Sequence, residues 1–313
     1  MQKKALLFFV ILAMLFTGCS TAFAEGLPMD DCSFGPAPKD ENYLSATQYK
    51  DSSIEVNMYD GRYCDTPYAY AHIKISHPSQ LRTAPGAKVT APNAEFHAQI
   101  TYIGRHIARA VNAVVAMNGD YYTKTDHCMV LLRQGHQYRN VTDGRPDLLI
   151  VDKEGNFSAL QGCKKADYAA FYKANKENLY QVFSFGPVMC KDGVSIIPED
   201  YTNRHIGAVK PTQRSAIAQI GPLEYLMITC EGPQSENSVG LTIYQFAALC
   251  EELGKKHSEN GCMLAFNMDG GNSSTLLFKG IDEKSGKLNY VKYNCPEIER
   301  DLSDIIYFAT LEE

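Results

Sequence analysis

The sequence contains no cluster of lysine and arginine residues, no low-complexity tract and no internal repeat. Proteins that bind nucleic acid or an anionic membrane surface through charge need a basic surface. The formal net charge here is -6, so no nucleic-acid or anionic-membrane partner is expected. The length of 313 residues, 45% of them hydrophobic, favours about one large domain.

The sequence also lacks zinc-type ligand spacing, because it has no C-x-x-C motif and no suitably spaced Cys/His pair. We therefore assign no metal-ligating residues. Ten cysteines are nevertheless present, and an exported chain can oxidise them. Their pairing cannot be derived from sequence, and we favour structural thiols. Nine of them lie beyond the N-terminal segment: Cys32, Cys64, Cys128, Cys163, Cys190, Cys230, Cys250, Cys262 and Cys295.

The N-terminal segment carries an apolar run, Ala5–Phe16, that is too short to span a bilayer as a helix. It follows two lysines and precedes small polar residues, a pattern typical of a secretory signal peptide over residues 1–24. Two cleavage sites compete. One is the A-F-A motif before Glu25, and the other is a lipobox-like stretch that would leave a lipid anchor at Cys19. We expect a protein that is secreted or anchored to the outside of a bacterial membrane.

The next part, residues 25–94, is predicted to form a leader and a small N-terminal β-rich lobe. Pro, Gly and Asp dominate up to about residue 42, which favours an exposed leader. Strand-like stretches follow at Ser53–Tyr59 and Tyr68–Ser76, the second with clear alternation.

From residue 95 onward, helix and strand patterns alternate. We predict a helix from about Phe96 to Asn112 and a buried strand over Ala113–Met117. A hairpin over residues 147–160, a surface helix over 166–180 and two strands within 182–197 follow.

A β-α-β unit is predicted in the C-terminal half. The stretch "RSAIAQIGPLEYLMITCEG" reads as a hairpin that pairs Arg214 with Cys230 or Glu231. A helix then starts at the capping box of Thr242 and Gln245 and stops at Gly254. The apolar strand 262–266 completes the unit.

The predicted fold class is therefore α+β or mixed α/β, with a mixed sheet, flanking helices, one β-α-β unit and the small N-terminal β-rich lobe. The carboxyl ends of two parallel strands in one sheet share an edge, where α/β sheets place ligands. Glu231 and Asp269 follow these two ends, and Asn118 and Asp120 follow the strand 113–117.

The stretch "NMDGGNSST" follows the last strand of the unit. Gly270 and Gly271 can align backbone N–H groups as an anion-binding nest, and Ser273 and Ser274 add donors. The alternative is a plain hairpin, because Asp-Gly is a favoured turn.

Several motifs, in order, resemble the phosphodiester glycosidase domain of the mannose 6-phosphate uncovering enzyme and its bacterial relatives. They are "AMNGDYY", "SFGPVMCKDG", "QRSAIAQIG", "TCEG", "SVGLTIYQFAALCEELG", "FNMDGGNSSTLLF" and "ERDLSDIIYF". The resemblance covers about residues 95–310 and indicates a glycosidase domain over 95–313. It implies hydrolysis of a sugar 1-phosphodiester, as when N-acetylglucosamine is removed from a phosphate-linked acceptor.

The resemblance also implies site residues. Those that match the family's motifs are Asn118, Arg214, Asp269, Gly270, Gly271, Ser273, Ser274 and Arg300. Three positions depart from the pattern: Asp120 and Asn272 stand where glycine is usual or frequent, and Glu231 replaces a common Asp. The first departure puts the floor of the pocket, and hence the identity of the substrate, in doubt.

The chemistry of such a substrate suggests roles for these residues. A phosphodiester needs cationic donors, which Arg214 and Arg300 supply, since guanidinium groups bind phosphate oxygens bidentately. The acetal carbon becomes cation-like in the transition state and needs carboxylates, for which Asp269 and Glu231 are the predicted catalytic pair. Asn118 and Asp120 are predicted to contact the substrate. No cofactor is required, although a divalent cation at Asp120, Glu231 and Asp269 stays an open alternative.

Three functions remain to be separated. The first is an exported phosphodiester glycosidase that acts on N-acetylglucosamine-1-phosphate-type diesters in cell-envelope or exopolysaccharide glycans. The second is a non-catalytic glycan- or phosphate-binding surface module. The third is a metal-dependent phosphodiesterase, which the lack of His/Asp metal motifs disfavours. The oligomeric state cannot be inferred.

Overall fold

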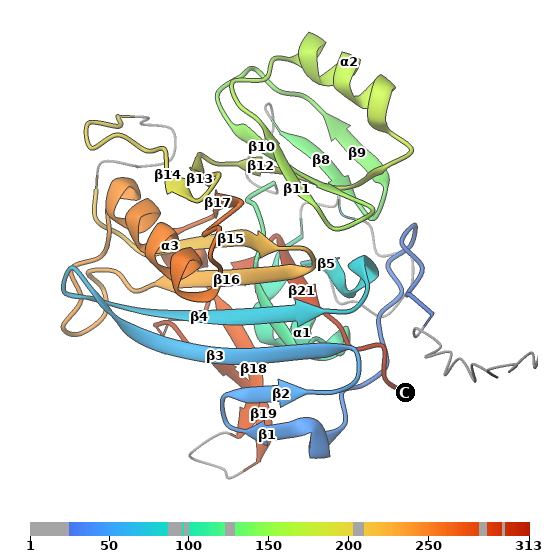
Figure 1. Ribbon diagram of the computed structural model, residues 1–313, viewed down its shortest axis with the longest axis vertical. Coiled ribbons are helices and arrows are strands. Elements are labelled where there is room, and N and C mark those ends of the chain that lie inside the picture. Colours follow the sequence, from blue (N-terminus) through green and yellow to red (C-terminus); the bar gives the residue numbers. More distant parts are fainter. Residues whose placement is uncertain are drawn as a thin grey trace, which may run out of the picture.

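The computed structural model describes residues 25–86, 96, 100–122, 129–202, 210–281, 287–295 and 298–313. The predicted signal peptide and Cys19 lie outside these residues. The described part is mostly β-sheet with three α-helices, an α+β fold (Figure 1). Three short 3-10 helices are Asp40–Asn42 (η1), Pro78–Gln80 (η2) and Gly271–Ser273 (η4).

The largest sheet has nine strands and runs across the middle of the molecule (Figure 1). In spatial order its strands are β1 (Tyr43–Ser45), β2 (Gln48–Lys50), β3 (Ile54–Tyr63), β4 (Thr66–Ile75), β16 (Glu224–Cys230), β15 (Arg214–Gly221), β17 (Leu264–Met268), β13 (Val188–Lys191) and β14 (Val194–Ser195).

Two five-stranded sheets and one small sheet complete the β-structure. The first contains β19 (Leu288–Lys292), β18 (Leu276–Ile281), β7 (Val115–Asn118), β21 (Asp304–Phe308) and β5 (Leu81–Pro85). The second contains β11 (Phe157–Leu160), β10 (Asp147–Asp152), β12 (Leu179–Phe185), β8 (Val130–Arg133) and β9 (His136–Asn140). The small sheet pairs β20 (Asp301–Leu302) with β6 (Tyr102–Ile103).

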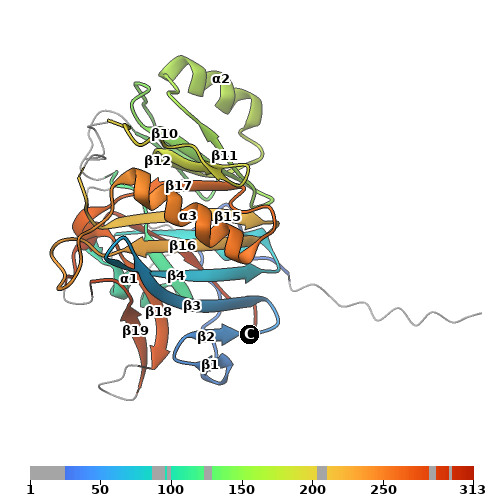
Figure 2. The ribbon, with the colours of Figure 1, turned by 60° about the vertical axis from the view of Figure 1, so that its left-hand side comes forward.

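Each α-helix covers one sheet. Helix α3 (Ile243–His257) lies along the nine-stranded sheet, and both ribbon views show it across β15 and β16 (Figures 1 and 2). Helix α1 (Gly104–Ala110) packs on the sheet that contains β7 and β21. Helix α2 (Lys165–Asn175) covers the sheet that contains β8 and β12.

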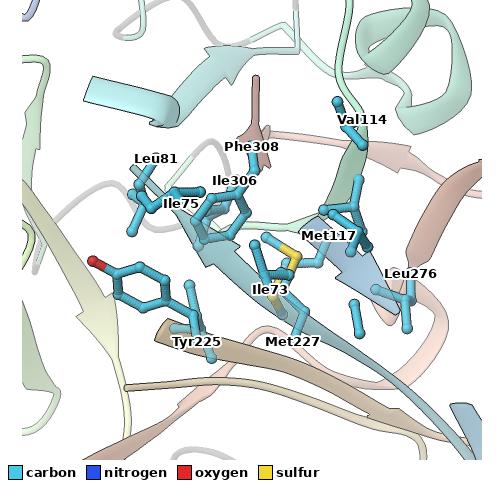
Figure 3. Close-up of a cluster of buried hydrophobic side chains, with 14 of the residues drawn as sticks. Ile73, Ile75, Leu81, Val114, Met117, Tyr225, Met227, Leu276, Ile306 and Phe308 are labelled. Atoms are coloured by element: carbon cyan, nitrogen blue, oxygen red, sulfur yellow. The ribbon is translucent and has the colours of Figure 1, made fainter. Parts of the chain in front are cut away.

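The main hydrophobic core lies between the nine-stranded sheet and the sheet of β5, β7, β18 and β21 (Figure 3). Ile73 and Met227 come from the first sheet, and Met117, Leu276 and Phe308 come from the second. Each buried side chain of this size contributes roughly 1.5–3 kcal/mol to folding. This sandwich fixes the strand ends at which the polar motifs lie.

The predicted mixed sheet is wrong at the level of strand pairs. In all described pairings, hydrogen-bonded neighbours are antiparallel. Strands β16 and β17, which α3 connects, run in the same direction but do not pair with each other. The hairpin partner β15 lies between them and is antiparallel to both.

The N-terminal part is β-rich, as predicted, but it does not form a separate lobe, because β1–β4 continue the nine-stranded sheet. Strand β16 pairs with β4 over the whole length of β16, from Glu224 opposite Lys74 to Cys230 opposite Tyr68. The leader packs against the sheets as well, because the buried Arg82 side chain donates hydrogen bonds to the backbone carbonyls of Pro28 and Asp31.

All three helices differ from the predictions in at least one boundary. The surface helix expected over residues 166–180 is α2, which ends at Asn175, because Leu179 and Tyr180 belong to β12. The helix expected from about Phe96 to Asn112 is α1, which begins only at Gly104, because Tyr102 and Ile103 pair with β20. Residues 97–99 lie outside the described part. Helix α3 begins at the predicted capping box but continues beyond Gly254 to His257, because the backbone of Gly254 is helical. Cys262 lies so close to Gly254 that a Cβ at this position would clash with it.

None of the helices in the described residues is long and apolar enough to cross a membrane. Among the cysteines of the described residues, free thiols are carried by Cys64, which is exposed, and by the buried Cys163, Cys190, Cys230, Cys250, Cys262 and Cys295. Cys19 and Cys128 lie outside these residues.

Candidate functional site

The ends of β16 and β17 and the start of β15 meet at one edge of the nine-stranded sheet. Arg214 pairs with Cys230 on one side, as predicted, and Ser215 pairs with Met268 on the other. Asp269 follows β17 directly, so it lies at this edge beside the start of β15.

Asn118 links this edge to the end of β7. Its side-chain amide donates to the carbonyl of Asp269 at 2.8 Å, and its Oδ1 accepts from Ser215 Oγ at 2.9 Å and Thr275 N at 3.0 Å. The hydroxyls of Ser215 and Ser274 lie 3.0 Å apart. Asn118 and Ser274 are buried. They therefore hold the Asp269 loop in place instead of facing a substrate.

The two glycines after Asp269 let the loop approach β15 closely. The N–H of Gly271 donates to the carbonyl of Gln213 at 2.9 Å, and a Cβ on Gly270 would lie 2.9 Å from the same oxygen. The N–H groups of Ser273 and Ser274 bond to the carbonyls of Gly270 and Gly271 in η4. The predicted anion-binding nest is thus wrong, because these amides are used within the protein.

The Asp269 carboxyl group is held in an environment that favours its neutral form. Burial raises its pKa to about 6, against the lowering effect of hydrogen bonds from Ser273 and the Gly270 backbone and of the Arg300 charge. The negative charge of Asp120 raises it further. A carboxyl group that titrates near neutral pH is suited to proton transfer.

Asp269 lies on the wall of a cavity of about 310 Å³ at the sheet edge. Arg214, Gly270 and Gly271 line the same cavity. The other lining residues are Tyr121, Met129, Pro146, Ser184, Phe185, Thr212, Gln213, Asn267 and Met268. The cavity combines apolar walls with a few polar groups, the usual composition of a small-molecule site.

Arg214 supplies positive charge in this wall. Its Nε donates to the carbonyl of Leu241 at 2.8 Å and its Nη2 to that of Lys210 at 3.0 Å, which fixes the guanidinium group. Burial lowers its pKa to about 10, so it stays charged at neutral pH.

Arg300 is exposed and lies against Tyr121, a residue of the cavity wall. Its Nη2 donates to the Tyr121 hydroxyl at 2.6 Å, and the guanidinium carbon lies 5.2 Å from the ring centre. Such a stacked and hydrogen-bonded arginine keeps a defined position while its charge remains accessible.

Asp120 is not at the surface of the cavity. Its side chain is fully buried and lies 3.0 Å from Nη2 of the equally buried Arg133. The same guanidinium group donates to Asp304 Oδ2 from Nε and Nη2 at 3.0 and 2.9 Å. The predicted substrate contact of Asp120 is therefore wrong, because this carboxylate forms a buried ion pair.

Glu231 lies outside the residues that line the cavity. Its carboxylate accepts a hydrogen bond from the backbone N–H of Cys295 at 3.4 Å. In the described part of the chain, no group of three or more His, Cys, Asp or Glu side chains has the arrangement of a metal site. Asp120, Glu231 and Asp269 thus do not form the cluster considered as a cation site.

Sequence reasoning did not single out three residues that contact the predicted site residues or their partners. They are Tyr121, which contacts Arg300, and Arg133 and Asp304, which form the buried ion pairs beside Asp120. Tyr121 and Asp304 lie within two of the family-type motifs, "AMNGDYY" and "ERDLSDIIYF", so their positions carried a signal. Arg133 lies in no motif, and nothing in the sequence marks it.

A substitution at Gly119 tests how closely Gly119 packs against the carboxyl group of Asp304. In Gly119→Ala the new Cβ would lie 2.6 Å from Cγ of Asp304, whose carboxylate Arg133 holds in place. We expect a loss of roughly 2–3 kcal/mol of unfolding free energy. Gly271→Ala, with φ of 59° but open space around the Cβ, is the matched control and should cost about 1 kcal/mol. Urea denaturation measures both, and equal losses would contradict the close packing.

A comparison with protein-family models identifies the domain. The model described as phosphodiester glycosidase matches residues 111–309. This chain belongs to the phosphodiester glycosidase family. The resemblance inferred from the motifs is confirmed, and the family is one of hydrolases.

Solved structures share the fold of this phosphodiester glycosidase domain. The zebrafish N-acetylglucosamine-1-phosphodiester alpha-N-acetylglucosaminidase catalytic domain, auto-inhibited by pro-peptide, has a TM-score of 0.59 and 16% identity, over 85% of this chain and 87% of that chain. A hypothetical protein from Synechocystis has a TM-score of 0.51 and 13% identity, over 82% of this chain and 62% of that chain. None of the curated protein sequences matches.

Proposed function

We propose that this protein hydrolyses the glycosidic bond of sugar 1-phosphodiesters. The observation that carries the proposal is the position of Asp269, a carboxyl group with a pKa near neutrality, on the wall of a cavity that is flanked by two arginines. The family and the fold support the same reaction class.

The transition state needs different charge stabilisation on the two sides of the scissile glycosidic bond. The anomeric carbon becomes cation-like, and an ionised Asp269 can stabilise it and either activate water or attack directly. The departing phosphate monoester is already a stable anion, so it needs positive charge more than a proton donor. A single well-placed carboxylate with nearby arginines meets both needs.

The two arginines have separate tasks in this proposal. Arg300 is exposed, and Tyr121 holds it at the cavity wall, so it is placed to bind the phosphate of an incoming diester. The bonds of Arg214 to the carbonyls of Leu241 and Lys210 fix it in the wall, where its charge stabilises the leaving phosphate. The catalytic role predicted for Glu231 stays a prediction, which Glu231→Gln tests.

The proposed substrate is an N-acetylglucosamine-1-phosphate-type diester in cell-envelope or exopolysaccharide glycans, reached by an exported enzyme. The zebrafish protein of similar fold is an N-acetylglucosamine-1-phosphodiester alpha-N-acetylglucosaminidase, which supports the sugar class. The signal-peptide pattern of residues 1–24 supports export. The cavity volume is at the lower end of the range for small-molecule sites, which suits one sugar unit and its phosphate.

Hydrolysis in heavy-oxygen water tests the reaction class directly. We expect the purified residue 25–313 protein to release free sugar from an N-acetylglucosamine-1-phosphodiester, with the label in the sugar. A neutral aryl N-acetylglucosaminide, which lacks the phosphate, is the matched substrate control and should react far more slowly. Label in the phosphate would indicate a phosphodiesterase. Binding of the diester without any turnover would indicate the non-catalytic glycan-binding module.

A further inference from the structure

The loop that carries Asp269 has little regular structure of its own. It comprises residues 269–275, between the end of β17 at Met268 and the start of β18 at Leu276, and its backbone forms one short turn, η4. Buried backbone N–H and C=O groups nevertheless need hydrogen-bond partners. The position of the Asp269 loop therefore depends on the side chains that supply these partners.

Two buried asparagine side chains bind this part of the chain, one from each side. Strand β18 lies between β7, which ends at Asn118, and β19, which Asn294 follows by two residues. The Asn294 amide donates to the carbonyl of Ser274 at 2.8 Å and accepts from the N–H of Leu276 at 2.9 Å. Asn118 accepts from the N–H of Thr275, the residue between them, at 3.0 Å. Successive residues of an extended chain point their backbone groups to opposite sides, so the two amides, here called the amide clamp, continue both ladders of β18.

The amide clamp fixes both ends of the Asp269 loop. At the first end, Asn118 donates to the carbonyl of Asp269 at 2.8 Å. At the other end, Asn294 holds the carbonyl of Ser274. The preceding residue, Ser273, donates a hydrogen bond to the carboxyl group of Asp269. A shift of Ser274 would therefore move a donor to the carboxyl group itself.

Asn294 is a neighbour of the site and not a substrate contact. Its side chain is fully buried and lies outside the residues that line the cavity. The buried Lys292 side chain donates to the carbonyls of Asn294 and Cys295, the second at 2.9 Å, so the backbone that carries the amide is held in turn. Hydrogen-bonded polar groups in a dry interior rigidify the segments that they join.

We propose that Asn294 is a positioning residue for Asp269, because the amide clamp holds the Asp269 loop from both sides and keeps its carboxyl group in the cavity wall. The catalytic consequence rests on the proposed function, in which Asp269 carries out the chemistry. A displacement of about 1 Å can reduce turnover by roughly 10²-fold. Asn294 thus controls the site without contact with the substrate.

Hydrogen exchange in the unaltered protein tests the amide clamp itself. The N–H groups of Thr275 and Leu276 have the two asparagine side chains as acceptors. We expect them to exchange as slowly as the N–H groups of Leu277 and Phe278 in the body of β18. Exchange at the rate of an exposed loop would overturn the proposal.

The variant Asn294→Leu removes both hydrogen bonds with a side chain of similar shape. In an NMR titration with carbon-labelled aspartate, with Asp269→Asn to assign the signal, the pKa of Asp269 should fall from about 6 towards its ordinary value of 3.8. The sign follows because burial is the main cause of the raised pKa, and a loosened loop lets water reach the carboxyl group. For a diester, kcat should fall by roughly 10- to 100-fold with KM unchanged.

Gln80→Met is the matched control. Gln80 is also fully buried, and its amide joins the carbonyl of Ala309, at 2.9 Å, to the N–H groups of Ser76 and His77, both at 3.0 Å. It follows the end of β4 that is opposite to the site edge. We expect a similar loss of stability without a change in the Asp269 titration or in kcat.

The titrations decide between the outcomes. An unchanged Asp269 titration in folded Asn294→Leu would overturn the proposal, whether or not the protein hydrolyses a diester. The same shift in Gln80→Met would overturn it as well, because the effect would then follow from a general loss of stability. A shift confined to Asn294→Leu, in a protein without turnover, would refute the proposed function and leave the positioning of Asp269 by Asn294 established.

Discussion

The Asp269→Asn variant is expected to lose turnover of a sugar 1-phosphodiester by on the order of 10³-fold while it keeps its fold. Asparagine has nearly the same shape and can still accept a hydrogen bond from Ser273, but it can neither take a proton from water nor stabilise the cation-like carbon. Steady-state kinetics on the diester, with kcat and KM determined separately, measures the loss. It should fall on kcat, because the groups that bind phosphate are unchanged.

Stability against pH provides the folding control for Asp269→Asn. The folded-state pKa of Asp269 is raised from 3.8 to about 6, so its contribution to stability is fully present below about pH 4 and is lost as pH rises through 6. The wild-type protein should lose this increment over that range, and the asparagine variant should not. Retained turnover in a folded variant would remove Asp269 from the chemistry.

The Glu231→Gln variant tests whether Glu231 acts in catalysis together with Asp269, as the sequence predicted. Glu231 lies outside the cavity lining and bonds to the backbone of Cys295, so we expect its substitution to cost far less turnover than Asp269→Asn. An equal loss would show that the pair acts together, as the motif pattern suggested.

Features of the fold that depend on neighbouring residues could be predicted from sequence. The hairpin of β15 and β16 has the expected register, because its turn and alternation fix the pairing. The capping box of Thr242 and Gln245 begins α3, because both partners lie in one turn. The order of strands across the sheets could not be predicted in this way. Strand β5, for example, pairs with β21 more than 200 residues away in sequence.

The same distinction applies to the site. Asp269, Arg214 and the glycine loop were recognised because each lies in a compact motif, and all of them reach the cavity wall. The buried partner of Asp120 was not recognised, because Arg133 lies in no motif, and its second carboxylate, Asp304, is 171 residues further along the chain. The polar groups around the glycines were misjudged for a related reason. Whether an amide is free depends on Gln213, which β15 brings to the loop.

Replacing Arg133 by Met should be the most destabilising single change among those considered. It leaves Asp120 and Asp304 buried, without their cation, in a region with no exposed side-chain surface. Removing one partner of such a pair costs about 3–5 kcal/mol, which corresponds to a fall in Tm of roughly 10 °C for a chain of this size. Arg105→Met, which breaks the exposed pair with Glu299, is the matched control and should cost less than about 1 kcal/mol.

A triple variant, Arg133→Met with Asp120→Asn and Asp304→Asn, separates charge from packing. If the loss in Arg133→Met arises from unpaired buried carboxylates, neutralising both should recover most of the stability, because a neutral interior avoids the desolvation cost. No recovery would show that the stacking of Arg133 on Phe183 and the fit of its guanidinium group hold the elements that carry these residues together. The two results separate the charge of this buried cluster from its packing as the source of its contribution to stability.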